Sequence, residues 1–264
     1  MPFNEHFPLY AIKAMKIKYD IDYPLDAPER TIYHKEIISK KHFLRKLYEQ
    51  WYSVFTEEIK KLPDGILLEL GSGGGFFKEL EPKVICSDVI SLPSNDMTFS
   101  ALEMPFENDS LSGIFMIDTF HHIPDSAHFL SEANRVLKKG GKIIMVEPAN
   151  TLWGRIIYQN FHHEPFQPES GWTIPPSGPL TGANGALPWI VFVRDQAFFR
   201  EKFPTLRIES VQYHHPLTYL ISGGVSYRQL MPDFSYKLVK LLDKLLPKVS
   251  KHLSMFMTIK ISRL

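Results

Sequence analysis

Residues 66 to 77 read ILLELGSGGGFF, and this stretch decides the fold class. An apolar run of strand length leads into a glycine-rich loop, and an amphipathic segment of helical character follows. Because glycines carry no side chain, a ligand can lie very close to the backbone of such a loop. The sequence therefore predicts a strand–loop–helix unit that binds a ligand at the end of the strand.

Composition limits the classes of protein to consider. The chain has 264 residues, of which 44% are hydrophobic and 13% aromatic, enough for a sizeable core. A net charge of +1 provides no basic field, so we expect no nucleic-acid partner. The single cysteine, Cys86, excludes an internal disulfide. The first 20 residues lack the pattern of a signal peptide, and no apolar run is long enough to span a membrane, so we expect a cytoplasmic protein.

The segments after the glycine loop alternate between short apolar runs and amphipathic ones. The runs 84–89, 114–118 and 142–147 read as strands, and the segments 76–80 and 125–137 read as helices. This alternation is typical of a parallel sheet with helices on both faces. The sequence therefore predicts an α/β fold with a doubly wound, mostly parallel sheet.

The chain divides into four predicted regions. Residues 1–62 form an N-terminal helical cap with one helix at 34–62, and residues 63–150 form the cofactor-binding α/β core. Residues 151–205 are rich in proline and glycine and are predicted to be an insertion or lid on the substrate side. Residues 206–264 complete the sheet with strands at 206–213 and 256–261, one of them antiparallel, and carry one basic amphipathic helix.

The spacing of the glycines distinguishes between two kinds of ligand. A dinucleotide-binding loop requires a third glycine at position 76, where this chain has Phe76, and the Gly-Lys-Ser/Thr of a P-loop is missing. Glu69 ahead of Gly71, with glycines at 71, 73 and 75, resembles the first motif of class I S-adenosylmethionine-dependent methyltransferases. The alternative is a glycine-rich turn of some other nucleotide-binding α/β protein.

A second stretch strengthens that resemblance. Residues 100–149 are similar to the methyltransferases of the ubiquinone and menaquinone pathways (the type 11 group), through Met104-Pro105-Phe106, His121-His122, Glu132, Arg135 to Lys138 and Gly140-Gly141. The resemblance covers about residues 64 to 148. It implies a seven-stranded, Rossmann-like class I methyltransferase fold, S-adenosyl-L-methionine as cofactor and a small-molecule acceptor.

The resemblance also implies a set of cofactor-binding residues. Glu69 suits the ammonium group of the cofactor, directly or through water, and Asp88, at the end of the second strand, suits the two ribose hydroxyls. Ser100 stands where relatives carry an aspartate for the adenine; either its hydroxyl replaces that carboxylate, Asp96 reaches in, or cofactor affinity is lower. The full set is Glu69, Gly71, Ser72, Gly73, Gly75, Asp88, Val89, Ser100, Ala101, Asp118 and His121.

Two His-His pairs are the candidates for a catalytic base. His121 and His122 follow the fourth strand, where a structural role is favoured over catalysis. The insertion supplies a second set, and the predicted acceptor contacts are Trp153, Tyr158, His162, His163 and Glu164. Its aromatic residues could equally form the core of the insertion itself. No metal is expected, because adjacent histidines diverge and the sequence shows no third ligand.

The segment 235–251 alternates leucines with lysines at helical spacing. We expect its leucines to pack on the sheet; in the alternative, the helix lies on an anionic membrane and helps to reach a lipid-linked acceptor. The sequence thus predicts methyl transfer to a small molecule, on oxygen, with a saccharide or a lipid-linked intermediate as acceptor. The alternative function is a non-catalytic S-adenosylmethionine-binding partner or sensor.

Overall fold

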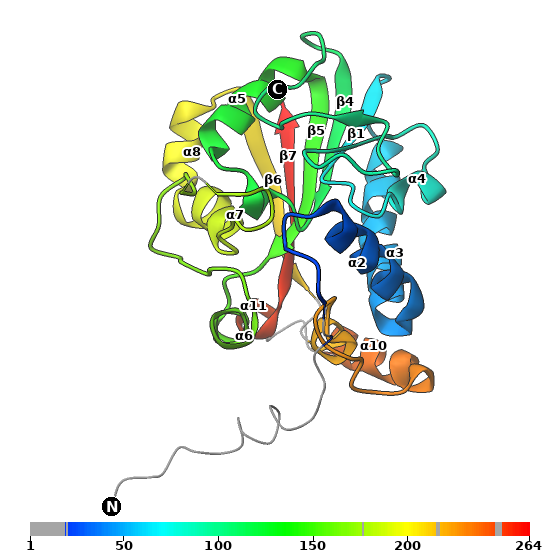
Figure 1. Cartoon of the computed structure of the whole chain (residues 1–264). Helices are drawn as coiled ribbons and strands as arrows, with labels where there is room; N and C mark the ends of the chain where they lie inside the picture. The colour runs from blue at the N-terminus through cyan, green and yellow to red at the C-terminus, as the bar shows by residue number, and fades with distance from the viewer. Residues whose placement is uncertain (1–18, 20, 176, 215–216, 246–249) are drawn as a thin grey trace, which may run out of the picture.

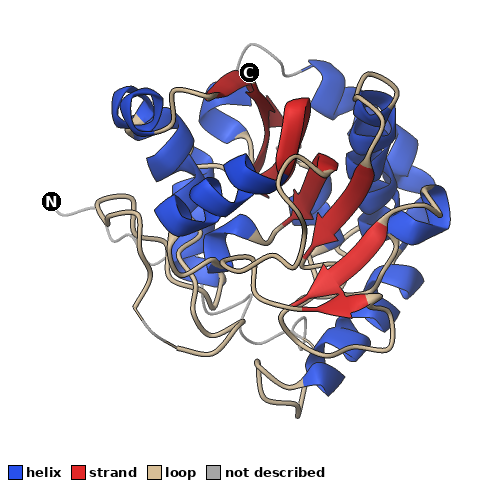
Figure 2. Ribbon diagram, turned by 90° about the horizontal axis from the view of Figure 1, so that it is seen from above, coloured by secondary structure: helices blue, strands red, loops and turns tan. Residues whose placement is uncertain are grey.

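A seven-stranded sheet forms the centre of the molecule, with helices on both of its faces (Figures 1 and 2). The computed structural model describes residues 19, 21–175, 177–214, 217–245 and 250–264. The strand order is β3-β2-β1-β4-β5-β7-β6. The strands are β1 (Ile66–Leu70), β2 (Ile85–Asp88), β3 (Met97–Thr98), β4 (Leu111–Ile117), β5 (Leu137–Pro148), β6 (Leu206–His214) and β7 (Phe256–Arg263).

The topology confirms the predicted doubly wound, mostly parallel sheet. Strands β1 to β5 pair in parallel, whereas β7 runs antiparallel to both β5 and β6. From β1 the chain winds outward to β2 and β3 and then returns to β4 on the other side of β1. Where the winding direction reverses, between β1 and β4, the loops after the two strands run in opposite directions and leave a crevice between them. This crevice is the usual ligand site of the architecture. The glycine loop after β1 and the turn after β4 therefore border one crevice.

The described part of the N-terminal cap, residues 19 and 21–62, differs from its prediction, because it contains two helices rather than one. Helices α2 (Pro28–Lys40) and α3 (His42–Ile59) are separated by Lys41, whose backbone is extended with φ −93° and ψ 111°. The buried Lys41 ammonium donates to the carbonyl oxygens of Gly224 and Tyr227. This long-range contact fixes the break, and a helical periodicity pattern does not report it. On the other side, α3 packs Trp51 against Phe256 of β7, with ring centroids 4.7 Å apart.

The core strands and helices are close to their predicted positions, with boundary shifts at both ends. Helix α4 spans Phe77–Leu80 and α5 spans Ser126–Val136, with Asp125 as N-cap accepting from the His128 backbone N–H at 2.9 Å. Strand β5 begins at Leu137, earlier than predicted, where it pairs with Leu111 of β4. Strand β3 was not predicted, because a strand of two residues has no periodicity to detect.

The proline- and glycine-rich region begins and ends with helices. They are α6 (Leu152–Phe161), α7 (Leu187–Trp189), the π-helix η2 (Ile190–Arg194) and α8 (Gln196–Lys202). Thr151 caps α6 through a hydrogen bond from the Gly154 backbone N–H at 2.9 Å. Phe192 and Phe199 are fully buried in the sheet's core cluster. The segment between α6 and α7 crosses the crevice as irregular chain and carries Glu164.

The C-terminal region corrects one expectation. Its elements before β7 are α9 (Thr218–Ser222), the 3-10 turn η3 (Asp233–Ser235), α10 (Tyr236–Leu245) and α11 (Ser250–Leu253). The prediction that the α10 leucines pack on the sheet is wrong, since Leu238, Leu241, Leu242 and Leu245 are 57%, 52%, 42% and 68% exposed. Tyr236 and Val239 are the buried side chains instead, and they pack against Phe43 of the cap. Leu246, Lys248 and the Lys251 side chain lie outside the described residues.

Within the part of the chain that the structure describes, no helix combines the length and the apolar character needed to cross a bilayer.

Candidate active site

The glycine loop after β1 has a backbone that only glycine adopts easily. Gly71, Gly73 and Gly75 have φ values of 65°, 50° and 70°. The Ser72 backbone N–H donates to the Ser87 carbonyl at 2.9 Å, which ties the loop to the end of β2. A Cβ at Gly71 would lie 2.4 Å from Thr119 Oγ1 in the turn after β4. The loop is therefore fitted against both neighbouring strand ends.

Asp88, at the end of β2, faces the glycine loop. One carboxylate oxygen accepts from the Gly73 backbone N–H at 3.2 Å, and the other accepts from that of Ile90 at 3.0 Å. Burial raises the pKa of Asp88, while these backbone hydrogen bonds oppose the increase. A carboxylate has further lone pairs, so Asp88 can also accept from the hydroxyls of a ribose.

Glu69 lies beneath the loop rather than beside the ligand space. Its side chain is buried, and its Oε2 lies 3.7 Å from the Cys86 thiol sulfur. Burial raises the pKa of Glu69 to about 7, against the effect of neighbouring Ser72, Tyr52 and Cys86. Glu69 is absent from the cavity wall described next, so a contact with the cofactor would be indirect.

A cavity of about 750 Å³ occupies the crevice between the strand ends. Of the predicted cofactor residues, its wall contains Gly71, Ser72, Gly73, Asp88, Val89, Ser100, Ala101 and Asp118. Gly75 supports the loop from outside the wall. The suggestion that Asp96 replaces the missing aspartate is wrong, because Asp96 pairs with Lys78 and accepts from the Cys86 backbone N–H at 2.9 Å, away from the cavity.

Asp118 ends β4 in the left-handed conformation, with φ 55°. Its side chain is 41% exposed although it lies deep in the molecule, because it faces the cavity. Removal from bulk water raises the pKa of Asp118 to about 7; nearby Glu164 and Glu147 add to the increase, and His121 opposes it. Near neutral pH this carboxyl group can therefore both accept and release a proton.

His121 is enclosed between two carboxylates and does not line the cavity. Its Nδ1 lies 2.8 Å from Glu147 Oε2 and its Nε2 lies 3.1 Å from Glu164 Oε2. Burial alone would lower the pKa of His121, but the two carboxylates outweigh it and raise that pKa well above its ordinary value. His121 therefore does not reach an acceptor directly, contrary to the prediction that it contacts the cofactor or serves as a base.

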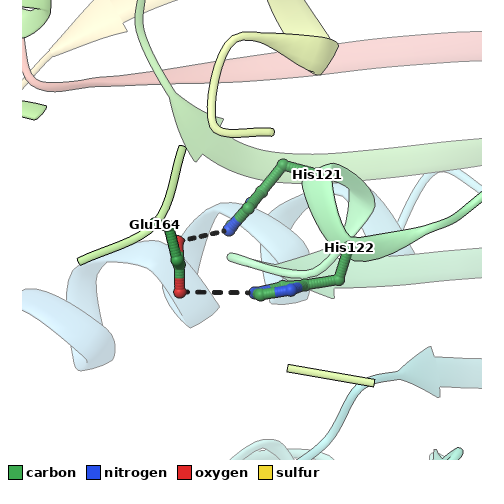
Figure 3. A group of neighbouring side chains, drawn as sticks. All are labelled: His121, His122 and Glu164. Atoms are coloured by element: carbon green, nitrogen blue, oxygen red, sulfur yellow. Dashed lines mark hydrogen bonds and ion pairs between the residues drawn. The ribbon is translucent and has the colours of Figure 1, made fainter. Parts of the chain in front are cut away.

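The other three candidate histidines, His122, His162 and His163, line the cavity together with Glu164. His122 Nδ1 donates to the Gly182 carbonyl at 2.9 Å, and its Nε2 lies 3.6 Å from Glu164 Oε1 (Figure 3). His162 Nδ1 and His163 Nε2 each lie 3.5 Å from an oxygen of Glu164. Burial, with the charge of His121, lowers the pKa of His122 to about 4. Glu164 of the insertion thus lies among two histidine pairs that are distant in sequence, His121-His122 and His162-His163.

Two predicted acceptor contacts lie elsewhere. Trp153 is on the outer side of α6 and is 36% exposed, and Tyr158 is buried with its hydroxyl donating to the Met255 carbonyl at 2.5 Å. Neither lines the main cavity, and Tyr158 stacks on Phe166 as part of the core beneath the insertion. Sequence reasoning missed the wall that the cap and α9 supply, because helix spacing alone does not show which face meets a ligand. That wall includes Thr31, His34, Tyr48, Tyr52 and Tyr219.

The strand order, the glycine loop and Asp88 define a class I methyltransferase fold. Residues 68–145 match the family described as "Methyltransferase domain". This central part of the chain is accordingly a methyltransferase domain. Gly71, Gly73 and Asp88 are suited to hold S-adenosylmethionine, because bare backbone and a half-buried acceptor border the same space.

Solved structures of other methyltransferases are similar at low identity. Geranyl diphosphate C-methyltransferase from Streptomyces coelicolor A3(2) is 12% identical, with 94% of this chain and 90% of that chain covered and a TM-score of 0.46. A possible histamine N-methyltransferase from Thermotoga maritima is 16% identical, with 87% and 99% covered and a TM-score of 0.44. A phosphoethanolamine N-methyltransferase of Haemonchus contortus is 12% identical, with 90% of this chain and 57% of that chain covered and a TM-score of 0.47.

Proposed function

We propose that this enzyme methylates an oxygen atom of a small hydroxyl-bearing molecule, bound between the glycine loop and Glu164. The observation that carries the proposal is a single cavity that Gly73 and Asp88 line together with Asp118 and Glu164. Its volume of about 750 Å³ lies in the range of ligand sites, about 300–1,000 Å³. The acceptor therefore shares one chamber with the cofactor.

Asp118 supports a hydroxyl acceptor in particular. A hydroxyl has to lose its proton as it is methylated, and a base is most effective when its pKa is near the working pH. The pKa of Asp118 is about 7, and its carboxyl group faces the cavity. The acceptor oxygen gains the methyl group while its proton passes to Asp118, and S-adenosylhomocysteine remains.

The exposed face of α10 favours a lipid-linked acceptor over a free saccharide. Exposed leucines lie beside Lys237, Lys240 and Lys244, a combination suited to an anionic lipid surface. Helix α10 packs on α9, and Tyr219 of α9 lines the cavity. A membrane that contacts α10 would therefore lie beside α9, which supplies part of the cavity wall.

The proposal is tested by supplying methyl-labelled S-adenosylmethionine with separate lipid and water-soluble metabolite extracts. The expected product carries the label on oxygen, is found in the lipid extract and is recognised by the carbon chemical shift of the new methyl group. A label on nitrogen or carbon contradicts the hydroxyl acceptor, and a product only in the water-soluble extract contradicts the lipid-linked one. Tight binding of S-adenosylhomocysteine without turnover of any extract would favour the non-catalytic alternative.

Membrane contact is tested by flotation with vesicles of phosphatidylcholine, with and without phosphatidylglycerol. The protein is expected to float with the anionic vesicles alone, and Leu241→Glu with Leu245→Glu should abolish flotation. Leu80→Glu is the matched control, because Leu80 is 50% exposed on α4, away from α10. Equal flotation of all three proteins, or none for the wild type, would refute the contact.

A further inference from the structure

Three side chains from two distant segments converge beside the cavity. His121 and His122 come from the 3-10 turn η1 (Phe120–His122) after β4, and Glu164 comes from the insertion (Figure 3). Their ligand atoms all lie within 4.8 Å of one another. His121 Nε2 lies 3.1 Å from Glu164 Oε2, and His122 Nε2 lies 3.6 Å from Glu164 Oε1. The second separation is too long for a hydrogen bond, so His122 Nε2 and Glu164 Oε1 face each other without a direct hydrogen bond between them.

Both rings are oriented by a partner at Nδ1. Glu147 holds His121 at 2.8 Å, and the Gly182 carbonyl holds His122 at 2.9 Å. A carbonyl oxygen only accepts, so His122 Nδ1 carries the proton, and in the neutral ring the Nε2 lone pair points at a carboxylate oxygen. Histidines that bind metals are held in this way, with the second ring N–H donated to a carboxylate or a carbonyl.

The charges around His121 favour a further cation. Glu147 is fully buried and the Glu164 side chain is 16% exposed. Two carboxyl side chains therefore lie against the same buried imidazole, and carboxylate oxygen together with imidazole nitrogen is a ligand set that binds divalent cations.

We propose that His121, His122 and Glu164 bind a divalent transition-metal ion of the zinc type. Zinc binds histidine nitrogen and carboxylate oxygen at about 2.0–2.2 Å, which places tetrahedral ligand atoms about 3.3–3.5 Å apart. The observed separations of 3.1 and 3.6 Å, each to a different Glu164 oxygen, lie on either side of that value, and the ligand atoms of the three residues lie within 4.8 Å of one another. Two imidazoles and one carboxylate also form a set that suits zinc, cobalt or iron better than magnesium. This inference replaces the sequence expectation that no metal binds.

The ion would face the acceptor. His122 and Glu164 line the cavity whereas His121 does not, so a coordination position not filled by the protein opens into the chamber. There the ion would bind an acceptor oxygen and make its proton easier for Asp118 to remove. This role, unlike metal binding itself, rests on the proposed function.

The test measures metal binding directly. Chelator-treated protein is titrated with Co²⁺, followed by visible absorption, and with Zn²⁺, followed by calorimetry. We expect one ion per chain, and at least about a 100-fold loss of affinity in His122→Gln and in Glu164→Gln, because ligand loss costs more than loss of a supporting residue. His128→Gln is the matched control, since His128 is exposed on α5 and should leave the affinity unchanged.

Absence of saturable binding in the wild type, or an equal loss in His128→Gln, would overturn the metal site. His121→Gln is not used, because it would leave Glu147 buried without its partner and could unfold the chain. S-adenosylhomocysteine binding is measured on the same metal-free protein. If this binding persists while metal binding fails, the metal site is refuted and the proposed methyl transfer is not.

Discussion

The substitution Gly71→Ala tests whether the glycine loop is packed as tightly as the structure shows. Gly71 and Gly73 have similar left-handed φ values, 65° and 50°, so alanine costs about 1–2 kcal/mol at either position through backbone strain. The two positions differ in their surroundings. A Cβ at Gly71 meets Thr119 Oγ1 at 2.4 Å and Cγ2 at 2.5 Å, whereas a Cβ at Gly73 meets Thr31 Cγ2 at 3.6 Å.

The difference in packing gives the expected magnitudes. Overpacking adds about 1–3 kcal/mol, so Gly71→Ala should lower the free energy of unfolding by about 2–5 kcal/mol and Gly73→Ala by about 1–2 kcal/mol. Because Gly73 lines the cavity, its added methyl should weaken S-adenosylhomocysteine binding more than it weakens folding. Urea unfolding without ligand measures the first effect, and calorimetry measures the second.

A double-mutant cycle identifies the cause. Thr119→Ala removes the two closest atoms, so in the Gly71→Ala background it should recover about 1–3 kcal/mol beyond its own effect. The same Thr119→Ala change should show no coupling to Gly73→Ala. Equal destabilisation at the two glycines, or no coupling at Gly71, would refute the packing argument.

Three further predictions concern carboxyl groups. Asp88→Asn should weaken S-adenosylhomocysteine binding by calorimetry about 10- to 100-fold, the loss of one charged hydrogen bond, and unchanged affinity would exclude a ribose contact. If Asp118 is the base, turnover should fall as pH drops through about 7. Asparagine suits the left-handed φ of 55°, so Asp118→Asn should fold and should lose this acidic limb of the pH–rate profile. An acidic limb retained in the variant would contradict the role of Asp118 as base. Burial raises the pKa of Glu58, but three lysines outweigh it and lower the pKa from 4.5 to about 2. The contribution of Glu58 to the free energy of unfolding is thus complete above pH 4.5 and lost as pH falls towards 2. Glu58→Gln should therefore lower the free energy of unfolding, measured with urea, by about 1–3 kcal/mol at pH 7 and by less at pH 3.5. The same loss at both pH values would contradict this role of Glu58. The lysines are Lys61, Lys142 and Lys260.

The local parts of the fold could be predicted because short-range sequence determines them. Strand β1 was predicted with its exact ends, and the 71/73/75 glycines coincide with the three left-handed positions of the loop. Helix α5, Ser126–Val136, also follows from local pattern and differs from the predicted range 125–137 by one residue at each end. The prediction of one continuous helix over 34–62 was wrong because the break depends on distant partners. Lys41 is held at this break by the carbonyl groups of Gly224 and Tyr227.

The α10 helix shows the limit of an amphipathic pattern. Leucines on one face indicate that something apolar covers them, but the pattern does not say what. In the structure Tyr236 and Val239 contact the cap, and the leucine face remains exposed. The prediction that Trp153 contacts the acceptor was wrong for a similar reason. With the same sequence spacing, an aromatic residue in the insertion can point to solvent, to the core or to a ligand.

The turn after β4 explains why the two neighbouring histidines have different surroundings. Asp118 reverses the chain in a left-handed conformation, so the next two backbone N–H groups, of Thr119 and Phe120, donate to Glu147 Oε1 at 2.9 and 2.7 Å. The other oxygen of Glu147 then accepts from His121, which draws that ring into the core. His122, one residue later, is left at the cavity wall opposite Glu164. One buried carboxylate at the end of β5 thus sets which histidine supports the site and which faces the ligand, a division that the His-His pair alone does not reveal.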